Sequence, residues 1–181
     1  RTSVSRLYGE DLPPGLGDRV LAVAAGTEGE ARLRVEFTPG RGIEATSAPL
    51  VGLAEPVVLA PVTVPGGLGP HKWRDRRLLD ALAAAVAPAI PLLVDLDGLI
   101  LEAAWASVVV AADGGLATPP LDGRILPGVG RERLIERARR EGRPVAERPI
   151  RLDELRAAAE VLIVNSLRGS VPAAVGDEPV R

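Results

Sequence analysis

Apolar and polar side chains alternate strictly over residues 31–38. One face of this segment carries Ala31, Leu33, Val35 and Phe37. Alternation with a period of two is typical of a strand with one buried face, so we predict a half-buried strand there. Residues 43–50 and 56–64 are predicted to follow as two further strands.

Helical spacing of leucine and valine predicts a helix over residues 73–86. Residues 1–8 and 18–25 are predicted to be shorter helices closed by glycine. In the second half of the chain, helices are predicted at 132–141 and 153–159. Strands are predicted there at 92–95, 99–101, 105–111, 145–150 and 161–164. The Asp97-Gly98 turn joins the first two of these strands in a hairpin and places Glu102 at the edge of a small antiparallel sheet.

The clearest break in composition is Pro65-Gly-Gly-Leu-Gly-Pro70. A segment of this kind is typical of a domain boundary. We therefore predict an N-terminal lobe over residues 1–64 and a larger C-terminal lobe over residues 65–181, in a mixed α/β (α+β) protein.

The composition limits the possible functions. Hydrophobic residues make up 46% of the 181 residues but aromatic residues only 2%, so the core must be aliphatic. A net charge of −2 offers no surface for nucleic acid or an anionic membrane. There is no cysteine and only one histidine, which argues against a metal site. The apolar runs are too short for a membrane span and the start is not a signal peptide, so we expect a cytoplasmic protein. We also expect that part of the native chain lies beyond one or both ends.

Lys72 is the single lysine of the chain and precedes the helix predicted at 73–86. A lysine amine can act as a nucleophile, as a covalent partner of a carbonyl or as a proton carrier. The alternative is that Lys72 has no chemical role and is the exposed start of a basic helix face. The glycine-rich loop over residues 118–131 likewise has two interpretations: it either presents backbone N–H groups to a phosphate or is an ordinary connection.

Taken together in this order, several motifs resemble the fold type IV pyridoxal-phosphate (PLP) enzymes of the class IV aminotransferase family. The motifs are His71-Lys72, Leu93-Val-Asp-Leu-Asp-Gly98 with Leu101-Glu102, Ala117-Thr-Pro-Pro-Leu121, Leu126-Pro-Gly-Val-Gly-Arg131 and Val164-Asn-Ser-Leu-Arg-Gly169. The resemblance implies a two-lobed fold, with a small N-terminal α/β sandwich and a C-terminal pseudo-barrel, and a homodimer that binds PLP.

The resemblance also assigns roles to individual residues. It implies that Lys72 holds the cofactor covalently and moves protons at the substrate Cα, and that Glu102 faces the pyridine nitrogen. The remaining cofactor contacts that it implies are Leu126 against the ring and Val129, Gly130 and Ser166 around the phosphate. For Glu102 the alternative is a solvated strand-edge charge, and for Ser166 a turn hydroxyl.

Three positions depart from the family's pattern. Ser107 stands where asparagine is usual, and Gly130 stands where threonine is usual, so we expect Gly130→Thr to leave cofactor affinity equal or better. For the phosphate-binding arginine of the N-terminal lobe, Arg1 fits the pattern better than Arg6 does.

The segment Asn165-Ser-Leu-Arg168 bears on the reaction. Asn165, Leu167 and Arg168 are expected to contact a small amino substrate, and their sequence resembles that of aminodeoxychorismate lyase. The first interpretation is therefore a lyase that converts 4-amino-4-deoxychorismate to 4-aminobenzoate and pyruvate in folate synthesis. The alternatives are a branched-chain or D-amino-acid aminotransferase that uses Lys72 in the same way, and a catalytically degenerate structural relative.

Overall fold

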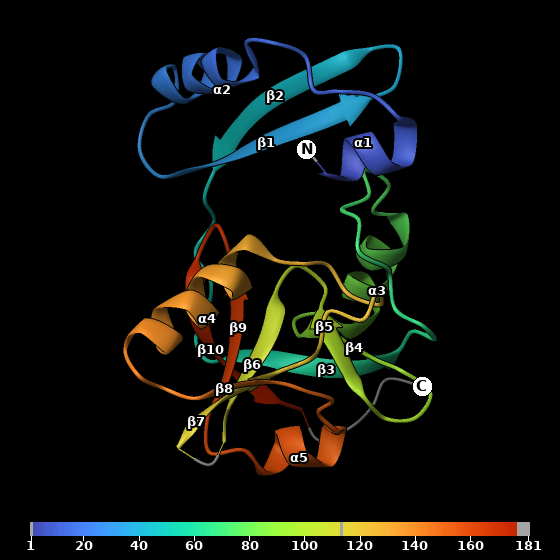
Figure 1. Ribbon diagram of the computed structural model, residues 1–181, viewed down its shortest axis with the longest axis vertical. Helices are drawn as coiled ribbons and strands as arrows, with labels where there is room; N and C mark the ends of the chain where they lie inside the picture. The colour runs from blue at the N-terminus through green and yellow to red at the C-terminus, as the bar shows by residue number, and fades with distance from the viewer. Residues whose placement is uncertain (1, 113, 177–181) are drawn as a thin grey trace. The chain divides into compact units, whose positions relative to one another are not determined.

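The computed structural model describes residues 2–112 and 114–176 (Figure 1). The chain forms two compact units. The first contains the residues up to Leu53 together with Lys72–Arg74, and the second contains Ala54–His71 and the residues from Asp75 onward.

The first unit consists of two helices and a hairpin, as the sequence predicted. The elements are α1 (Thr2–Tyr8), α2 (Leu16–Ala25), β1 (Ala31–Thr38) and β2 (Gly42–Pro49). Figure 1 shows α2 lying along the antiparallel pair β1–β2. The apolar face of β1 is only partly covered, since Leu33 is 38% and Val35 44% exposed. No described residue of this unit is fully buried, so its core is thin.

The second unit is built on an eight-stranded sheet in the order β5-β4-β3-β10-β9-β6-β7-β8. The strands are β3 (Val57–Thr63), β4 (Ile90–Val94), β5 (Ile100–Ala103), β6 (Ser107–Ala112), β7 (Gly115–Thr118), β8 (Val145–Glu147), β9 (Val161–Asn165) and β10 (Gly169–Val175). β3, which lies before the predicted boundary at Pro65, pairs in parallel with β4 and β10 of this sheet.

The sheet curls strongly. β5 is at one end of the strand order and β6 is in sixth place, yet only residues 104–106 join them and Ala103 bridges to Ala106. Leu99, just before β5, also bridges to Arg151, which follows the strand at the opposite end of the order. Such contacts between distant parts of a sheet require curvature. The predicted pseudo-barrel is confirmed.

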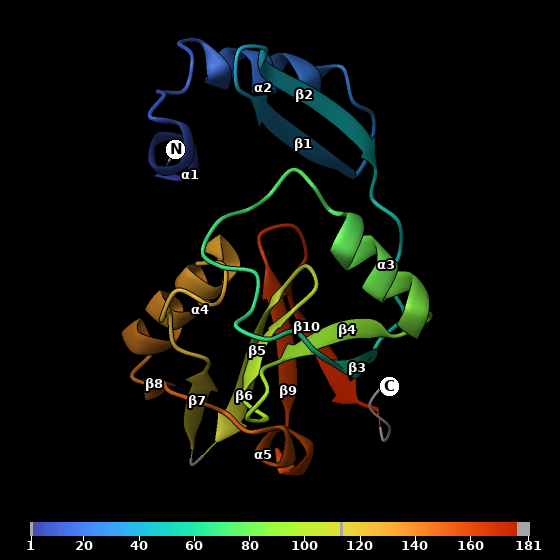
Figure 2. The same ribbon diagram turned by 90° about the vertical axis from the view of Figure 1, so that its right-hand side faces the viewer.

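Helices α3 (Arg77–Val86), α4 (Val129–Arg140) and α5 (Leu152–Ala157) flank the curled sheet (Figure 2). α3 lies beside β4, and α4 lies beside β9. All five residues of β4 are buried, as expected of an inner strand that is covered on both faces. Leu59, Leu92, Ile163 and Val108 are fully buried and mark the centre of the core.

Several boundaries differ from the prediction. α3 begins at Arg77 rather than at Trp73, because the Asp75 carboxylate accepts a hydrogen bond from the Arg77 N–H and ends an irregular segment there. α4 begins three residues earlier than predicted, at Val129. β7 and β10 were not predicted, since glycine and proline interrupt their patterns. Within residues 2–112 and 114–176, no helix is long and apolar enough to cross a membrane.

Candidate active site

Glu102 and Leu126, two residues predicted to contact the cofactor, lie together in the second unit. Glu102 is the half-buried polar residue of β5, whose other side chains are buried. Its Oε2 accepts a hydrogen bond of 3.4 Å from the Leu126 N–H. The loop that leads to α4 is therefore held against the edge strand of the sheet, with the carboxylate beside it.

The first turn of α4 presents the predicted phosphate amides. At the start of the helix, the Glu132 N–H donates to the Gly128 carbonyl oxygen at 3.0 Å. The N–H groups of Val129 and Gly130 come before it and have no acceptor within the helix. The N-cap residue, Gly128, supplies no side-chain cap. Because the N-terminus of a helix carries a partial positive charge, these amides suit an anion.

Two glycines allow this turn to lie close to neighbouring segments. A Cβ at Gly130 would be only 2.5 Å from the carbonyl carbon of Asn165, at the end of β9. A Cβ at Gly128 would be 2.7 Å from the Oγ of Ser107, which is 5% exposed at the start of β6. The turn thus lies against the start of β6 and the end of β9, two strands that pair with each other. The expectation that Gly130→Thr is harmless conflicts with this geometry, since a threonine would collide with the Asn165 backbone.

The turn between β9 and β10 contains the residues expected to contact substrate. The Asn165 Oδ1 accepts hydrogen bonds from the N–H groups of Leu167, at 2.8 Å, and Arg168, at 2.7 Å. This oxygen therefore shapes the turn. Ser166 and Leu167 are exposed and Arg168 is half-buried. The contact between Asn165 and Gly130 brings this turn beside the predicted phosphate amides.

Lys72 is exposed and belongs with the first unit, together with Trp73 and Arg74. Arg74 pairs there with Glu36 at 3.2 Å. The residues on either side, His71 and Asp75, belong to the second unit, so only the three residues Lys72–Arg74 of this segment group with the first. The predicted Arg1 lies outside the described residues.

The sequence did not single out Arg131, which is buried beside the predicted phosphate amides at 3% exposure. Its guanidinium donates to Glu147 Oε2 at 3.0 Å, to the Pro119 carbonyl oxygen at 2.9 Å and to Thr118 Oγ1 at 3.3 Å. These bonds tie α4 to β7 and β8. A signal was present, because Arg131 is in register with Ile135 and Ala138, the other buried residues of α4.

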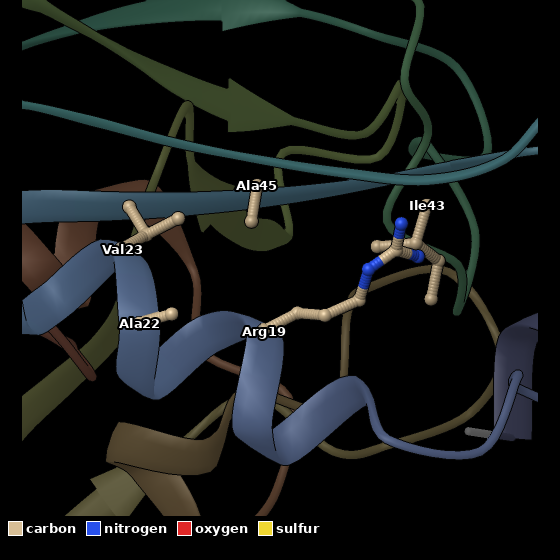
Figure 3. Close-up of a pocket in the computed structure, with 5 residues that line it drawn as sticks. All are labelled: Arg19, Ala22, Val23, Ile43 and Ala45. Carbon is tan, nitrogen blue, oxygen red and sulfur yellow. The ribbon is translucent and has the colours of Figure 1, made fainter.

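A hollow of about 320 Å³ lies in the first unit, and no predicted site residue lines it. Its walls are Arg19, Ala22 and Val23 of α2 and Ile43 and Ala45 of β2. Figure 3 shows Arg19 reaching from the helix toward Ile43. Two alanines at this contact are too small to fill the space between helix and hairpin, which accounts for the gap.

The amino-transferase class IV profile matches residues 74–175, which is more than half of the chain. The chain belongs to this family, and its curled sheet has the fold type IV architecture.

The comparisons with individual proteins agree on the fold. A provisionally named amino-acid aminotransferase from Mesorhizobium loti is 29% identical, with a TM-score of 0.78 over 96% of this chain and 89% of its own. The 4-amino-4-deoxychorismate lyase of Pseudomonas aeruginosa is 26% identical, with a TM-score of 0.78 over 99% and 75%. A probable branched-chain-amino-acid aminotransferase of Thermotoga maritima is 36% identical over 81 residues, which is 45% of this chain and 30% of that protein.

The close approach at Gly130 gives a stability prediction. Gly130→Ala is expected to destabilise the protein by about 1–3 kcal/mol, because the new Cβ forces α4 and the end of β9 apart. Gly17→Ala in α2 is the matched control, since nothing lies within 4 Å of the added Cβ. It should stabilise by about 0.5–1 kcal/mol. Denaturant titration of both variants measures this, and equal effects would contradict the close contact.

The Arg131–Glu147 pair gives a pH prediction. Hydrogen bonding from Arg131, with a smaller contribution from Arg139, lowers the pKa of Glu147 below its usual 4.5. A carboxylate with a lowered folded pKa stabilises the fold above about pH 4.5, and this is lost as the pH falls through the folded pKa. At pH 7, Glu147→Gln should cost about 1–2 kcal/mol, a value moderated by the 35% exposure of Glu147.

Below pH 4 the difference in unfolding free energy between parent and Glu147→Gln should shrink. The control is Glu141→Gln, which removes the partner of Arg137 in an exposed pair on the same helix. A Glu147→Gln effect no larger than this control at pH 7 would show that the buried arginine does not depend on Glu147.

Proposed function

We propose that the protein is a PLP-dependent lyase that converts 4-amino-4-deoxychorismate to 4-aminobenzoate and pyruvate. The observation that carries the proposal is the convergence, within the second unit, of Glu102, Leu126, the first turn of α4 and the Asn165–Arg168 turn. Family membership adds to it, as does the similarity to the Pseudomonas aeruginosa lyase over almost the whole chain.

The residues present fit the cofactor. A phosphate ester needs backbone or cationic donors, and the two first-turn amides of α4 have no helical acceptor. The close approaches of Gly130 to Asn165 and of Gly128 to Ser107 hold these amides beside the turn between β9 and β10. A pyridine nitrogen needs a carboxylate to stay protonated, and Glu102 is half-buried beside the same loop.

PLP, when bound, withdraws electron density from the α-carbon of an amino substrate. In this proposal Val129 and Gly130 hold its phosphate through N–H groups, with Ser166 adding a hydroxyl. Glu102 keeps a proton on the ring nitrogen, and Leu126 covers the ring. Ser107 packs against the same turn at Gly128.

The Lys72 amine would hold the cofactor covalently and, when free, would take the proton from the substrate Cα. The ring becomes aromatic when the enolpyruvyl group departs, and the proton taken from Cα would convert the departing enolpyruvate to pyruvate, so no oxidant or reductant is needed. Asn165 shapes the turn that places Leu167 and Arg168 beside the substrate.

A second candidate is a class IV aminotransferase. Several relatives that match in sequence are branched-chain-amino-acid aminotransferases, among them the Thermotoga maritima protein and a rat mitochondrial enzyme that is 52% identical over 56 residues. The matched segments span only 30% and 14% of those proteins. An aminotransferase would use Lys72 to return the proton to the cofactor instead of releasing pyruvate.

We also propose a cytoplasmic homodimer, on the family resemblance alone. Light scattering of the purified protein measures its mass, and a monomer at assay concentration would contradict this part of the proposal.

The reaction is tested by two parallel assays of the purified, PLP-loaded protein. With 4-amino-4-deoxychorismate, we expect equal amounts of 4-aminobenzoate and pyruvate, and none with Lys72→Ala. With branched-chain amino acids and 2-oxoglutarate, we expect no glutamate. Glutamate alone would establish the second candidate. No product from either assay, with the cofactor bound, would identify a degenerate relative.

Phosphate binding is tested by Val129→Pro. Proline is tolerated at the first position of a helix and removes one N–H donor. Gly128 before it already has φ −73° and ψ 128°, the extended conformation that a residue before proline prefers. We expect PLP affinity to fall by about 1.5–3 kcal/mol, roughly 10- to 150-fold in Kd, as measured by fluorescence titration of the apo-protein. Val129→Ala, at a 52% exposed position, should bind as the parent does. Equal affinity in a folded Val129→Pro variant would remove the phosphate assignment.

A further inference from the structure

Asp95, Arg124 and the glycines of the 66–69 segment form a cluster that none of the assigned roles uses. Asp95 follows β4 and is 16% exposed at its side chain. Arg124 lies in the loop before Leu126 and is 28% exposed at its side chain. All of these residues belong to the second unit.

The Asp95 carboxylate connects two segments that are far apart in sequence. Its Oδ1 accepts a hydrogen bond of 3.0 Å from the Gly66 N–H, and its Oδ2 accepts one of 2.7 Å from Arg124 Nη1. A second carboxylate, from Asp122, accepts from Arg124 Nε at 2.9 Å and fixes the guanidinium from the other side. One side chain thus joins the segment before Lys72 to the loop before Leu126.

The backbone makes a second connection between the same segments. The Gly69 N–H donates to the Arg124 carbonyl oxygen at 3.1 Å. Gly67 has φ +71° and approaches that same oxygen so closely that any Cβ there would collide with it. A side-chain bridge through Asp95 and a main-chain hydrogen bond therefore both connect the 66–69 segment to Arg124.

The two connections join residues that lie just before Lys72 to residues that lie just before Leu126. Gly69 is three residues before Lys72, and Arg124 is two residues before Leu126 and five before Val129. We propose that Asp95 and Arg124 are positioning residues, which fix the place where the chain departs toward Lys72 relative to the loop that carries Leu126 and Val129. The inference rests on the proposed function, because it assigns the lysine to the cofactor.

A positioning role makes a distinct prediction about the attachment of the cofactor. Attachment requires the Lys72 nitrogen to replace the aldehyde oxygen of PLP, which leaves as water. If the departure point of the chain shifts, the phosphate can still bind at α4, but the amine must search a wider volume before it reacts. We expect the rate of attachment to fall about 10- to 100-fold in Arg124→Met, with little change in the Kd of the phosphate-bound cofactor.

The test mixes apo-protein with PLP, adds borohydride at timed intervals and quantifies the modified Lys72 peptide by mass spectrometry. Asp95→Asn should show a smaller decrease than Arg124→Met, because its amide oxygen can still accept from Gly66 while the ion pair is lost. Arg137→Met is the control, since it removes an arginine from the exposed pair with Glu141. Hydrogen exchange of the apo-protein should be faster in residues 64–72 of both test variants, a readout that needs no cofactor.

The possible results distinguish a failure of the proposed function from a failure of the positioning role alone. If the parent protein gives no modified Lys72 peptide, the proposed function fails. If the parent is modified and Arg124→Met and Asp95→Asn are modified at the parent's rate, only the positioning role fails. A variant that loses thermal stability and exchanges faster throughout the chain, with attachment slowed no more than in an equally destabilised Leu155→Ala protein, would assign the cluster to general stability and also overturn the inference. Leu155 is a buried residue of α5 that has no role in the proposed site.

Discussion

The contact between the first turn of α4 and the end of β9 is the constraint on which the candidate site depends. Gly130 approaches the Asn165 backbone so closely that no side chain fits. That approach places the start of the helix beside the turn that carries Ser166, Leu167 and Arg168. A helix N-terminus alone is a common feature, but one held beside a specific loop is a defined place for an anion.

Two sets of polar interactions hold this turn in position. On one side, the buried Arg131 binds Thr118, Pro119 and Glu147 and anchors α4 to β7 and β8. On the other side, Glu102 accepts from Leu126 at the edge strand. A buried guanidinium is stable only when its donors are satisfied, so the three partners of Arg131 account for its burial. The sheet's curvature supplies the geometry, since β5 and β6 lie side by side in spite of their places in the strand order.

Much of the fold followed from local patterns. The alternation over Ala31–Thr38 gave a strand with those bounds, and the Asp97-Gly98 turn lies between β4 and β5 as expected. The unpredicted strands β7 and β10 have little pattern of their own and depend on pairing with β6, β8, β9 and β3. Long-range pairing of this kind leaves no trace in a short window of sequence.

In the candidate site, too, local motifs were predictable and long-range contacts were not. Motifs singled out Glu102, Leu126 and Val129, and the fold places them in one unit. The buried role of Arg131 and the bridge from Asp95 to Arg124 could not be predicted, because each depends on which distant segments meet. The steric reason for glycine at position 130 is also tertiary, since the obstructing atoms are those of Asn165.

We propose that this chain holds PLP through Lys72, its single lysine. The most direct measurement is borohydride reduction of the PLP-reconstituted protein, followed by peptide mapping. We expect one phosphopyridoxyl group on the peptide that contains Lys72, and none on the Lys72→Ala protein. A reconstituted parent protein that remains folded and carries no such group would show that Lys72 does not hold the cofactor.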